Sequence, residues 1–131
     1  MTNTPPITEP VIRIIAMPAD TNPHGDIFGG WLMSQMDLGA GTVAMRRCKG
    51  RAVTVAMEGM QFHAPVVVGD EVSVFGALVS EGRTSMTIAV ECWRRERDED
   101  HSAKVTEANF TFVAIDDKGR PRPIDSGPIN P

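Results

Sequence analysis

The fold of this chain depends on one stretch, residues 29–50, which reads GGWLMSQMDLGAGTVAMRRCKG. Apolar residues recur along it at the spacing of one helix face, namely at Leu32, Met36, Ala40 and Val43. The pair Lys49-Gly50 supplies the basic residue and the glycine that commonly end a helix. The spacing therefore predicts a helix of about five turns that begins near Gly29 and ends at Lys49-Gly50.

Asp37 is the only charged residue between Asp26 and Arg46. It lies beside the predicted apolar face and not opposite it, so its carboxylate is expected at the margin of the core. A carboxylate in apolar surroundings loses hydration and needs hydrogen bonds or water, and catalytic sites use such surroundings to tune a general base. Asp37 is therefore a candidate catalytic residue. The small residues 39–41 that follow it predict that a sheet packs closely against this turn.

Strand patterns dominate the rest of the chain. A short strand is expected before the helix, over residues 11–16, and four strands are expected after it, over residues 53–62, 71–80, 84–95 and 104–115. The connections between the later strands are too short for crossover helices, so the sheet is expected to be largely antiparallel. The predicted class is α+β, with one long helix packed against that sheet.

Composition and length fit a single domain. The chain has 131 residues, of which 41% are hydrophobic and 23% charged. We expect a flexible N-terminal tail over residues 1–10, one domain over 11–120 and a proline-rich flexible C-terminal tail over 121–131. The sequence contains neither a signal-peptide pattern nor an apolar run of about 18 residues. A cytoplasmic protein that does not bind membranes is therefore expected.

Charge and cysteine content exclude other classes of protein. Cys48 and Cys92 are the only cysteines and fit neither a disulfide framework nor a metal-ligand spacing, so two buried, unreactive thiols are expected. The net charge of -4 argues against binding to nucleic acid. Four cations lie within residues 46–51; they complement the negative end of the helix, or alternatively attract an anionic ligand.

Residues 17–37, MPADTNPHGDIFGGWLMSQMD, resemble the signature of the hotdog-fold acyl-CoA thioesterases of the YciA and acyl-CoA hydrolase type. Further segments match that family in register: VTVAME at 53–58, Pro65 with Val68-Gly69-Asp70, GRTS at 82–85 and FTFVA at 110–114. The resemblance extends from Val11 to Ile124. It implies a hotdog fold, in which an antiparallel sheet wraps a long central helix, and homodimers that commonly form hexamers as trimers of dimers.

The resemblance also implies an activity and a set of site residues. The implied reaction is hydrolysis of acyl-CoA to free CoA and a carboxylic acid, with Asp37 as general base or nucleophile. Asp26 matches a loop position that works with this aspartate, usually across the dimer interface. Arg83, Thr84 and Ser85 match a segment that contacts the CoA phosphates or pantetheine, although Thr84 replaces the more usual serine. Asn22 is a further substrate-binding candidate, while its simplest role is to form a turn.

Thioester hydrolysis needs an activated water and donors for the negative charge that develops on the carbonyl oxygen. The start of a helix leaves unpaired N–H groups, and glycine lets a substrate approach the backbone, so Gly30 is a candidate oxyanion donor. The reaction requires no metal or cofactor. Asp26 has an alternative role, because an aspartate three residues before Gly29 can instead cap the helix.

Two other functions remain open on the sequence. One is a non-hydrolytic acyl-CoA binding or sensing module, which would normally be joined to an effector domain; residues 1–10 and the segment after Ile124 are too short to form one. The other is a hotdog dehydratase, which uses an Asp and His pair, but no histidine follows Asp37 in the helix. A serine hydrolase triad is not expected, because the chain lacks the Gly-x-Ser-x-Gly elbow.

Overall fold

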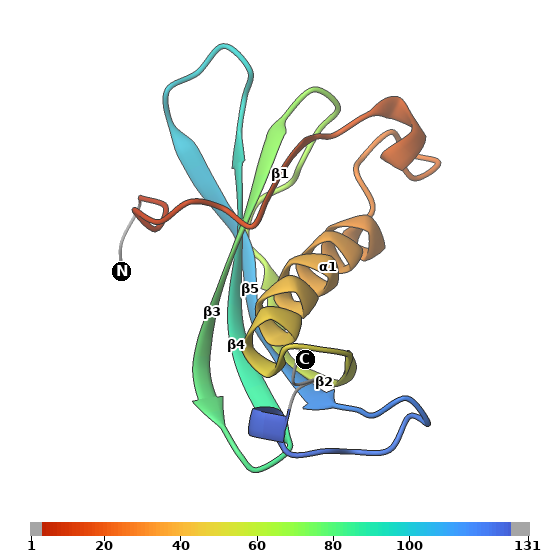
Figure 1. Cartoon of the computed structure of the whole chain (residues 1–131). Helices are drawn as coiled ribbons and strands as arrows, with labels where there is room; N and C mark the ends of the chain where they lie inside the picture. Colours follow the sequence, from red (N-terminus) through yellow and green to blue (C-terminus); the bar gives the residue numbers. More distant parts are fainter. Residues whose placement is uncertain (1–3, 127–131) are drawn as a thin grey trace.

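The computed structural model describes residues 4–126 and shows a five-stranded sheet wrapped around one long helix (Figure 1). The elements, in chain order, are β1 (Ile12–Ile15), the 3-10 helix η1 (Pro18–Asp20), α1 (Gly29–Cys48), β2 (Ala52–Phe62), β3 (Glu71–Glu81), β4 (Ser85–Arg95), β5 (Ser102–Ala114) and the 3-10 helix η2 (Ile124–Ser126). The predicted α+β class and the order of strand, helix and four strands are confirmed. Each predicted strand is found with its ends displaced by no more than two residues.

The strands lie in the order β1-β3-β4-β5-β2, and every neighbouring pair is antiparallel. The first two strands in the chain therefore occupy the two edges of the sheet. β1 contributes only four residues, whereas β2 contributes eleven, with register shifts after Thr54 and after Glu58. Nearly every residue of β2 is exposed, so residues 4–126 leave this long edge uncovered.

The core lies between α1 and the concave face of the sheet (Figure 1). On β4 the side chains at Met86, Ile88, Val90 and Cys92 are buried, as the alternation in the sequence predicts. They meet a helix face formed by Leu32, Met36, Ala40 and Ala44. A Cβ atom at Gly39 would lie 3.1 Å from Cγ1 of Val74 on β3, so glycine there allows the close packing that the small residues predict.

Both cysteines are free and buried, as expected: Cys48 at the end of α1 and Cys92 on β4. Burial raises the pKa of the Cys92 thiol to about 12, because the thiolate would lose its hydration. No helix within residues 4–126 is long and apolar enough to span a membrane.

The C-terminal end of α1 is held by residues distant in the sequence. Lys49 adopts a left-handed conformation (φ 58°) and donates its N–H to the carbonyl of Met45, so the helix ends at the predicted position. Arg47 donates to both carboxylate oxygens of Glu81 at 2.7 and 2.8 Å and to Asp125 at 3.0 Å. These bonds raise the pKa of Arg47, first through Glu81 and then through Asp125. One cation of the basic segment is thus paired within the fold.

The expected C-terminal tail, residues 121–131, is packed along the part that the structure describes. Arg122 donates from Nη2 to the carbonyl of Cys48 at 2.9 Å and from Nε to the carbonyl of Ile115 at 3.1 Å. Ile124 is buried in the core. The domain therefore continues past residue 120 to at least 126, while residues 127–131, like residues 1–3, lie outside the described part.

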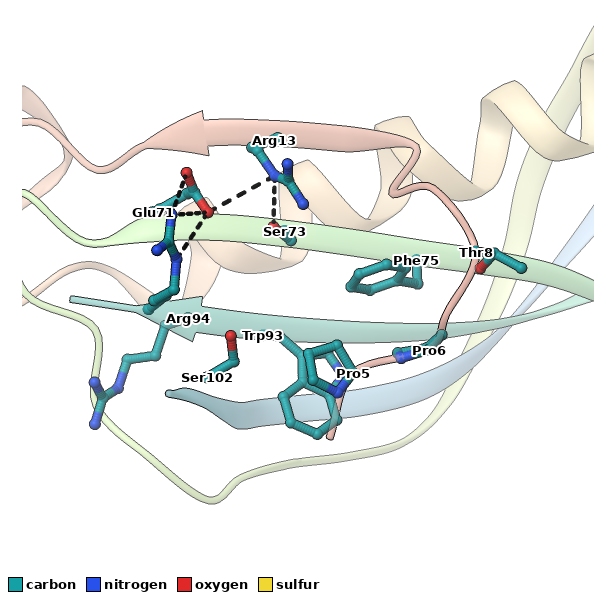
Figure 2. Close-up of a pocket in the computed structure, with 11 residues that line it drawn as sticks. Pro5, Pro6, Thr8, Arg13, Glu71, Ser73, Phe75, Trp93, Arg94 and Ser102 are labelled. Carbon is teal, nitrogen blue, oxygen red and sulfur yellow. Dashed lines mark hydrogen bonds and ion pairs between the residues drawn. The ribbon is translucent and has the colours of Figure 1, made fainter. Parts of the chain in front are cut away.

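The N-terminal segment crosses the convex face of the sheet before β1 (Figure 1). Pro5, Pro6 and Thr8 line a cavity of about 220 Å³ together with Phe75 of β3 and Trp93 of β4. Figure 2 shows this cavity and, at its edge, Glu71 next to Arg13, at 3.7 Å. Glu71 also accepts from Arg95 at 3.2 Å. This segment covers two aromatic side chains that face away from the helix.

Candidate active site

The helix and the edge strand place Asp37 and Thr54 side by side. Thr54 lies on β2 opposite Phe112 of β5, whose side chain is buried in the core, so the threonine faces the helix. Its hydroxyl donates a 2.6 Å hydrogen bond to Oδ1 of Asp37. The carboxylate is half-buried, which confirms its expected place at the margin of the core. Thr54 supplies the hydrogen bond that a carboxylate in these surroundings needs.

Sequence reasoning missed Thr54. The residue lies in the apolar run Ala52 to Met57, where alternation alone does not say which face points to the helix. The sequence did contain a signal. Thr54 is the one hydroxyl residue of its strand and Asp37 is the one carboxylate of the helix, so the two are possible hydrogen-bond partners. Only the register of β2 against β5, with its bulge after Thr54, shows that the two groups meet.

The start of α1 presents backbone donors without an acceptor in the described chain. Phe28 is the N-cap and its side chain makes no capping bond, and the first helical bond runs from Leu32 N to Phe28 O at 3.2 Å. The N–H groups of Gly29, Gly30 and Trp31 precede that bond. Gly30 is exposed, and a Cβ atom there would meet nothing within 4 Å. Open donors of this kind suit a negatively charged oxygen.

The loop before the helix is built by Asn22. Its Oδ1 accepts from the N–H groups of His24 at 2.9 Å and Asp26 at 3.2 Å, while its own N–H donates to the carbonyl of Asp26 at 2.7 Å. The turn-forming role of Asn22 is therefore confirmed, and substrate binding by this residue stays a prediction. The alternative role of Asp26 as helix cap is wrong, because Phe28 occupies the N-cap position and no side chain caps the helix.

One chain does not bring all predicted site residues together. Asp37 lies eight residues beyond Gly29, about 12 Å along the helix axis, and no hydrogen bond joins Asp26 to Asp37 in the described residues. Arg83 and Thr84 lie in the turn between β3 and β4 and Ser85 begins β4, at the opposite end of α1 from the Asp26 loop (Figure 1). Their roles in binding stay predictions.

Within residues 4–126, neither a histidine nor a group of metal-binding side chains lies next to Asp37 in the helix. His24 lies in the loop before α1 and His63 directly follows β2, and both are exposed. Within residues 4–126, one group of carboxylates has donor atoms within 4.8 Å of one another, namely Glu96, Asp98 and Glu99. These three are exposed on the hairpin between β4 and β5, and exposed acidic groups of this kind are common.

Comparison with known proteins supports the family suggested by the sequence. The family model described as Thioesterase superfamily matches residues 24–101, which is more than half of the chain. The acyl-CoA thioester hydrolase YciA of Salmonella typhimurium is 50% identical over 95% of each chain. An uncharacterized acyl-CoA thioester hydrolase of Zymomonas mobilis is 56% identical over 88% of this chain and 78% of its own.

A solved structure shows the same similarity in three dimensions. The hexameric thioesterase y2039 from Yersinia pestis superposes with a TM-score of 0.86 at 49% identity, covering 93% of this chain and 99% of its own. The predicted hotdog fold is thereby confirmed, with the sheet left open in one chain. The chain belongs to the thioesterase superfamily and, within it, to the family of acyl-CoA thioester hydrolases that includes YciA.

Proposed function

We propose that this protein hydrolyses acyl-CoA to free CoA and a carboxylic acid, with Asp37 as the central catalytic residue. The observation that carries the proposal is the 2.6 Å hydrogen bond from Thr54 to Oδ1 of Asp37. It holds the carboxylate at the margin of the core while leaving Oδ2 without a donor among the described residues. The family membership supports the reaction class, since the curated relatives are acyl-CoA thioester hydrolases.

The chemistry follows from the free carboxylate oxygen. As a general base, Oδ2 takes a proton from a water molecule while the water oxygen bonds to the thioester carbon. The carbonyl oxygen gains negative charge, which the N–H groups near Gly30 of the partner subunit stabilise, because Gly30 and Asp37 of one chain lie about 10 Å apart along α1. The C–S bond then breaks, and the CoA sulfur receives the proton held by Asp37. As a nucleophile, Oδ2 would bond to the carbon itself while the C–S bond breaks and CoA leaves as the thiolate, and water would then cleave the resulting anhydride to the carboxylic acid and free Asp37. Both routes use the same two groups.

The proposed site is completed by a second subunit. Among residues 4–126 no strand pairs with the outer edge of the eleven-residue β2, and an open edge of this kind is a template for pairing with another chain. Apolar side chains are exposed on it at Val53, Val55 and Met57. Because Asp26 lies far from Asp37 in one chain, we propose that Asp26 of the partner subunit approaches Asp37 in a dimer formed along this edge.

We extend this proposal to a hexamer built as a trimer of dimers, since the similar protein from Yersinia pestis is a hexameric thioesterase. In that assembly Arg83, Thr84 and Ser85 of a neighbouring subunit contact the CoA phosphates or pantetheine. An exposed guanidinium suits phosphate, because Arg binds its oxygens in a bidentate way. Replacing Arg83 with Ala is then expected to raise KM for acyl-CoA while kcat changes little.

A cytoplasmic location and the absence of nucleic-acid binding stay predictions from the sequence.

The test is a measurement of free-thiol release from a panel of acyl-CoAs by the wild type, Asp37→Ala and Asp37→Asn. Asp117→Ala serves as the matched control, because Asp117 is an exposed acid in the turn after β5. Circular dichroism and gel filtration establish that the variants keep their fold and assembly. Loss of roughly 10²-fold or more in both Asp37 variants alone supports the proposal. Binding of acyl-CoA without turnover by the wild type would overturn it in favour of a sensing module.

A further inference from the structure

The first two residues of α1 differ in their surroundings. At Gly29 an added Cβ would lie 3.3 Å from Cζ of Phe62 and 3.5 Å from its Cε2, so the tip of this ring lies against the start of the helix. At Gly30 an added Cβ would meet nothing within 4 Å. Contact with the ring therefore accounts for glycine at position 29, whereas position 30 is open.

Phe62 is the last residue of β2, and the strand fixes its position. The carbonyl of Gln61, just before it, accepts from the hydroxyl of Thr106 at 2.5 Å. The N–H of His63, just after it, donates to the carbonyl of Val105 at 2.7 Å. Phe62 is nevertheless 48% exposed. The sheet thus holds a half-exposed aromatic ring in a fixed place beside the helix start.

The ring lies next to hydrogen-bond donors that have no acceptor in the part of the chain that the structure describes. These are the N–H groups of Gly29, Gly30 and Trp31, which precede the first helical bond. In the proposed reaction they stabilise the oxyanion that forms next to Asp37 of the partner subunit. Water competes for such donors, and their bond to a charged oxygen is stronger where water is excluded. An apolar side chain beside the donors excludes water from that side.

We propose that Phe62 is a positioning residue of this reaction. Its ring keeps water away from the Gly29 side of the helix start and leaves Gly30 as the open side for the carbonyl oxygen. The tip of the ring points to the helix, and the edge of an aromatic ring carries partial positive charge, so it does not repel a negatively charged oxygen. The inference rests on the proposed hydrolysis at Asp37 and adds a residue of the edge strand to that site.

The test compares Phe62→Met with Phe62→Gln, because these unbranched side chains have similar lengths and differ in polarity. kcat and KM are measured for one acyl-CoA that the wild type hydrolyses. Phe62→Met should keep most of the activity, since an apolar side chain still covers the donors. Phe62→Gln and Phe62→Ala should lower kcat about 10-fold with little change in KM. Val79→Gln is the matched control, because Val79 is an apolar residue of β3, 57% exposed, outside these contacts.

A second measurement shows whether Phe62 acts through the backbone donors. Gly30→Ala hinders the approach of the carbonyl oxygen to these N–H groups, so Phe62→Gln should lower kcat much less in the Gly30→Ala background than in the wild type. A residue that only supports the strand would lower kcat by the same factor in both backgrounds. Gel filtration and circular dichroism establish that each variant keeps the assembly and fold of the wild type.

The outcomes separate the inference from the function on which it rests. If the wild type hydrolyses no acyl-CoA, both the proposed function and the inference fail. If the wild type is active but Phe62→Met and Phe62→Gln lower kcat equally, or if the effect of Phe62→Gln is unchanged by Gly30→Ala, only the inference is overturned. Phe62 is half-exposed, so we expect its variants to fold, and Phe62→Ala repeats the test without a new polar group.

Discussion

Thr54 of the edge strand and Asp37 of the central helix are joined by a single 2.6 Å hydrogen bond. β2 is exposed along nearly its whole length, and among the described residues this is the one side-chain hydrogen bond between the strand and α1. Thr54 faces the helix because it pairs in regular register with Phe112 of β5, and a bulge follows it in the strand. The position of the carboxylate is therefore coupled to the conformation of the edge strand.

Replacing Thr54 with valine keeps the shape of the side chain but removes the hydroxyl. Because a hydrogen bond to a charged group contributes about 1.5–3 kcal/mol, kcat should fall roughly 10- to 100-fold. Thr54→Ser keeps the donor and should retain most of the activity, which distinguishes positioning of Asp37 from a loss of packing. Steady-state kinetics on one acyl-CoA checks this. Equal activity of the valine and serine variants would show that the hydrogen bond does not matter for turnover.

Gly30→Ala tests the backbone donors at the helix start. An added Cβ would meet nothing within 4 Å, so the free energy of unfolding should stay the same or rise by up to about 1 kcal/mol. Activity should nevertheless fall by about 10-fold or more, because the methyl group hinders the approach of the carbonyl oxygen to the N–H groups. Kinetics and urea unfolding are measured on the same preparation. Full activity in a stable variant would remove Gly30 from the site.

The fold could be predicted because its strongest signals are periodic and local. The apolar spacing of residues 32–43 and the alternation on β4 do not depend on distant residues, and both survive in the structure. The partner of Asp37 could not be predicted in the same way. Thr54 meets it only through the register of two strands and a bulge, which no local pattern encodes.

The remaining site residues show a second limit of local patterns. Asp26 and Asp37 are both polar residues in a matching motif, yet one chain holds them apart. The cap of α1 also differs from what the sequence suggested. Phe28 occupies the N-cap position, whereas Asp26 had been a candidate for capping the helix. The sequence motif therefore identified candidate catalytic residues. Whether these residues come together in one site depends on contacts between elements and, in our proposal, between subunits.

Gly39 and Gly41 form a matched pair for stability. Gly39→Ala forces a methyl group against Val74, and overpacking of this kind costs about 1–3 kcal/mol, partly offset by about 1 kcal/mol of helix propensity. Gly41→Ala gains the same propensity with only ordinary contacts. Urea unfolding should therefore rank Gly41→Ala as the more stable variant by about 1–3 kcal/mol. Equal stability of the two variants would mean that the sheet and the helix can separate at Gly39 without cost, which would contradict the prediction.

The buried thiol of Cys92 gives a prediction for alkaline pH. Its pKa is about 12 in the folded chain against an ordinary value of 9.0. Below pH 9 both states keep the proton, but above it the unfolded chain ionises first and is favoured. Stability should therefore fall as the pH rises from about 9 toward 12. The chain has no tyrosine to titrate in this range.

Urea unfolding at pH 8 and pH 10 measures that fall, and Cys92→Val removes this titration while keeping an apolar side chain in the core. The difference in stability between the two pH values should be smaller in the variant than in the wild type. An identical difference would place the alkaline sensitivity at a group other than Cys92.

A site shared between subunits can be tested by mixing two inactive proteins. We expect Asp26→Ala and Asp37→Ala to be separately inactive or nearly so. If Asp26 acts across a symmetric dimer, a mixed dimer contains one site with both carboxylates and one site with neither. Random mixing gives mixed dimers in about half of the population, so the activity should recover to about a quarter of the wild-type value.

The mixture is made by unfolding and refolding the two variants together, and each variant refolded alone is the control. A titration of one variant against the other should give a maximum at equal amounts, because the fraction of mixed dimers is greatest there. If Asp26 and Asp37 acted within one chain, neither variant could supply a complete site and no proportion would restore turnover. Recovery therefore reports directly which subunit supplies Asp26, independently of how strongly either residue contributes.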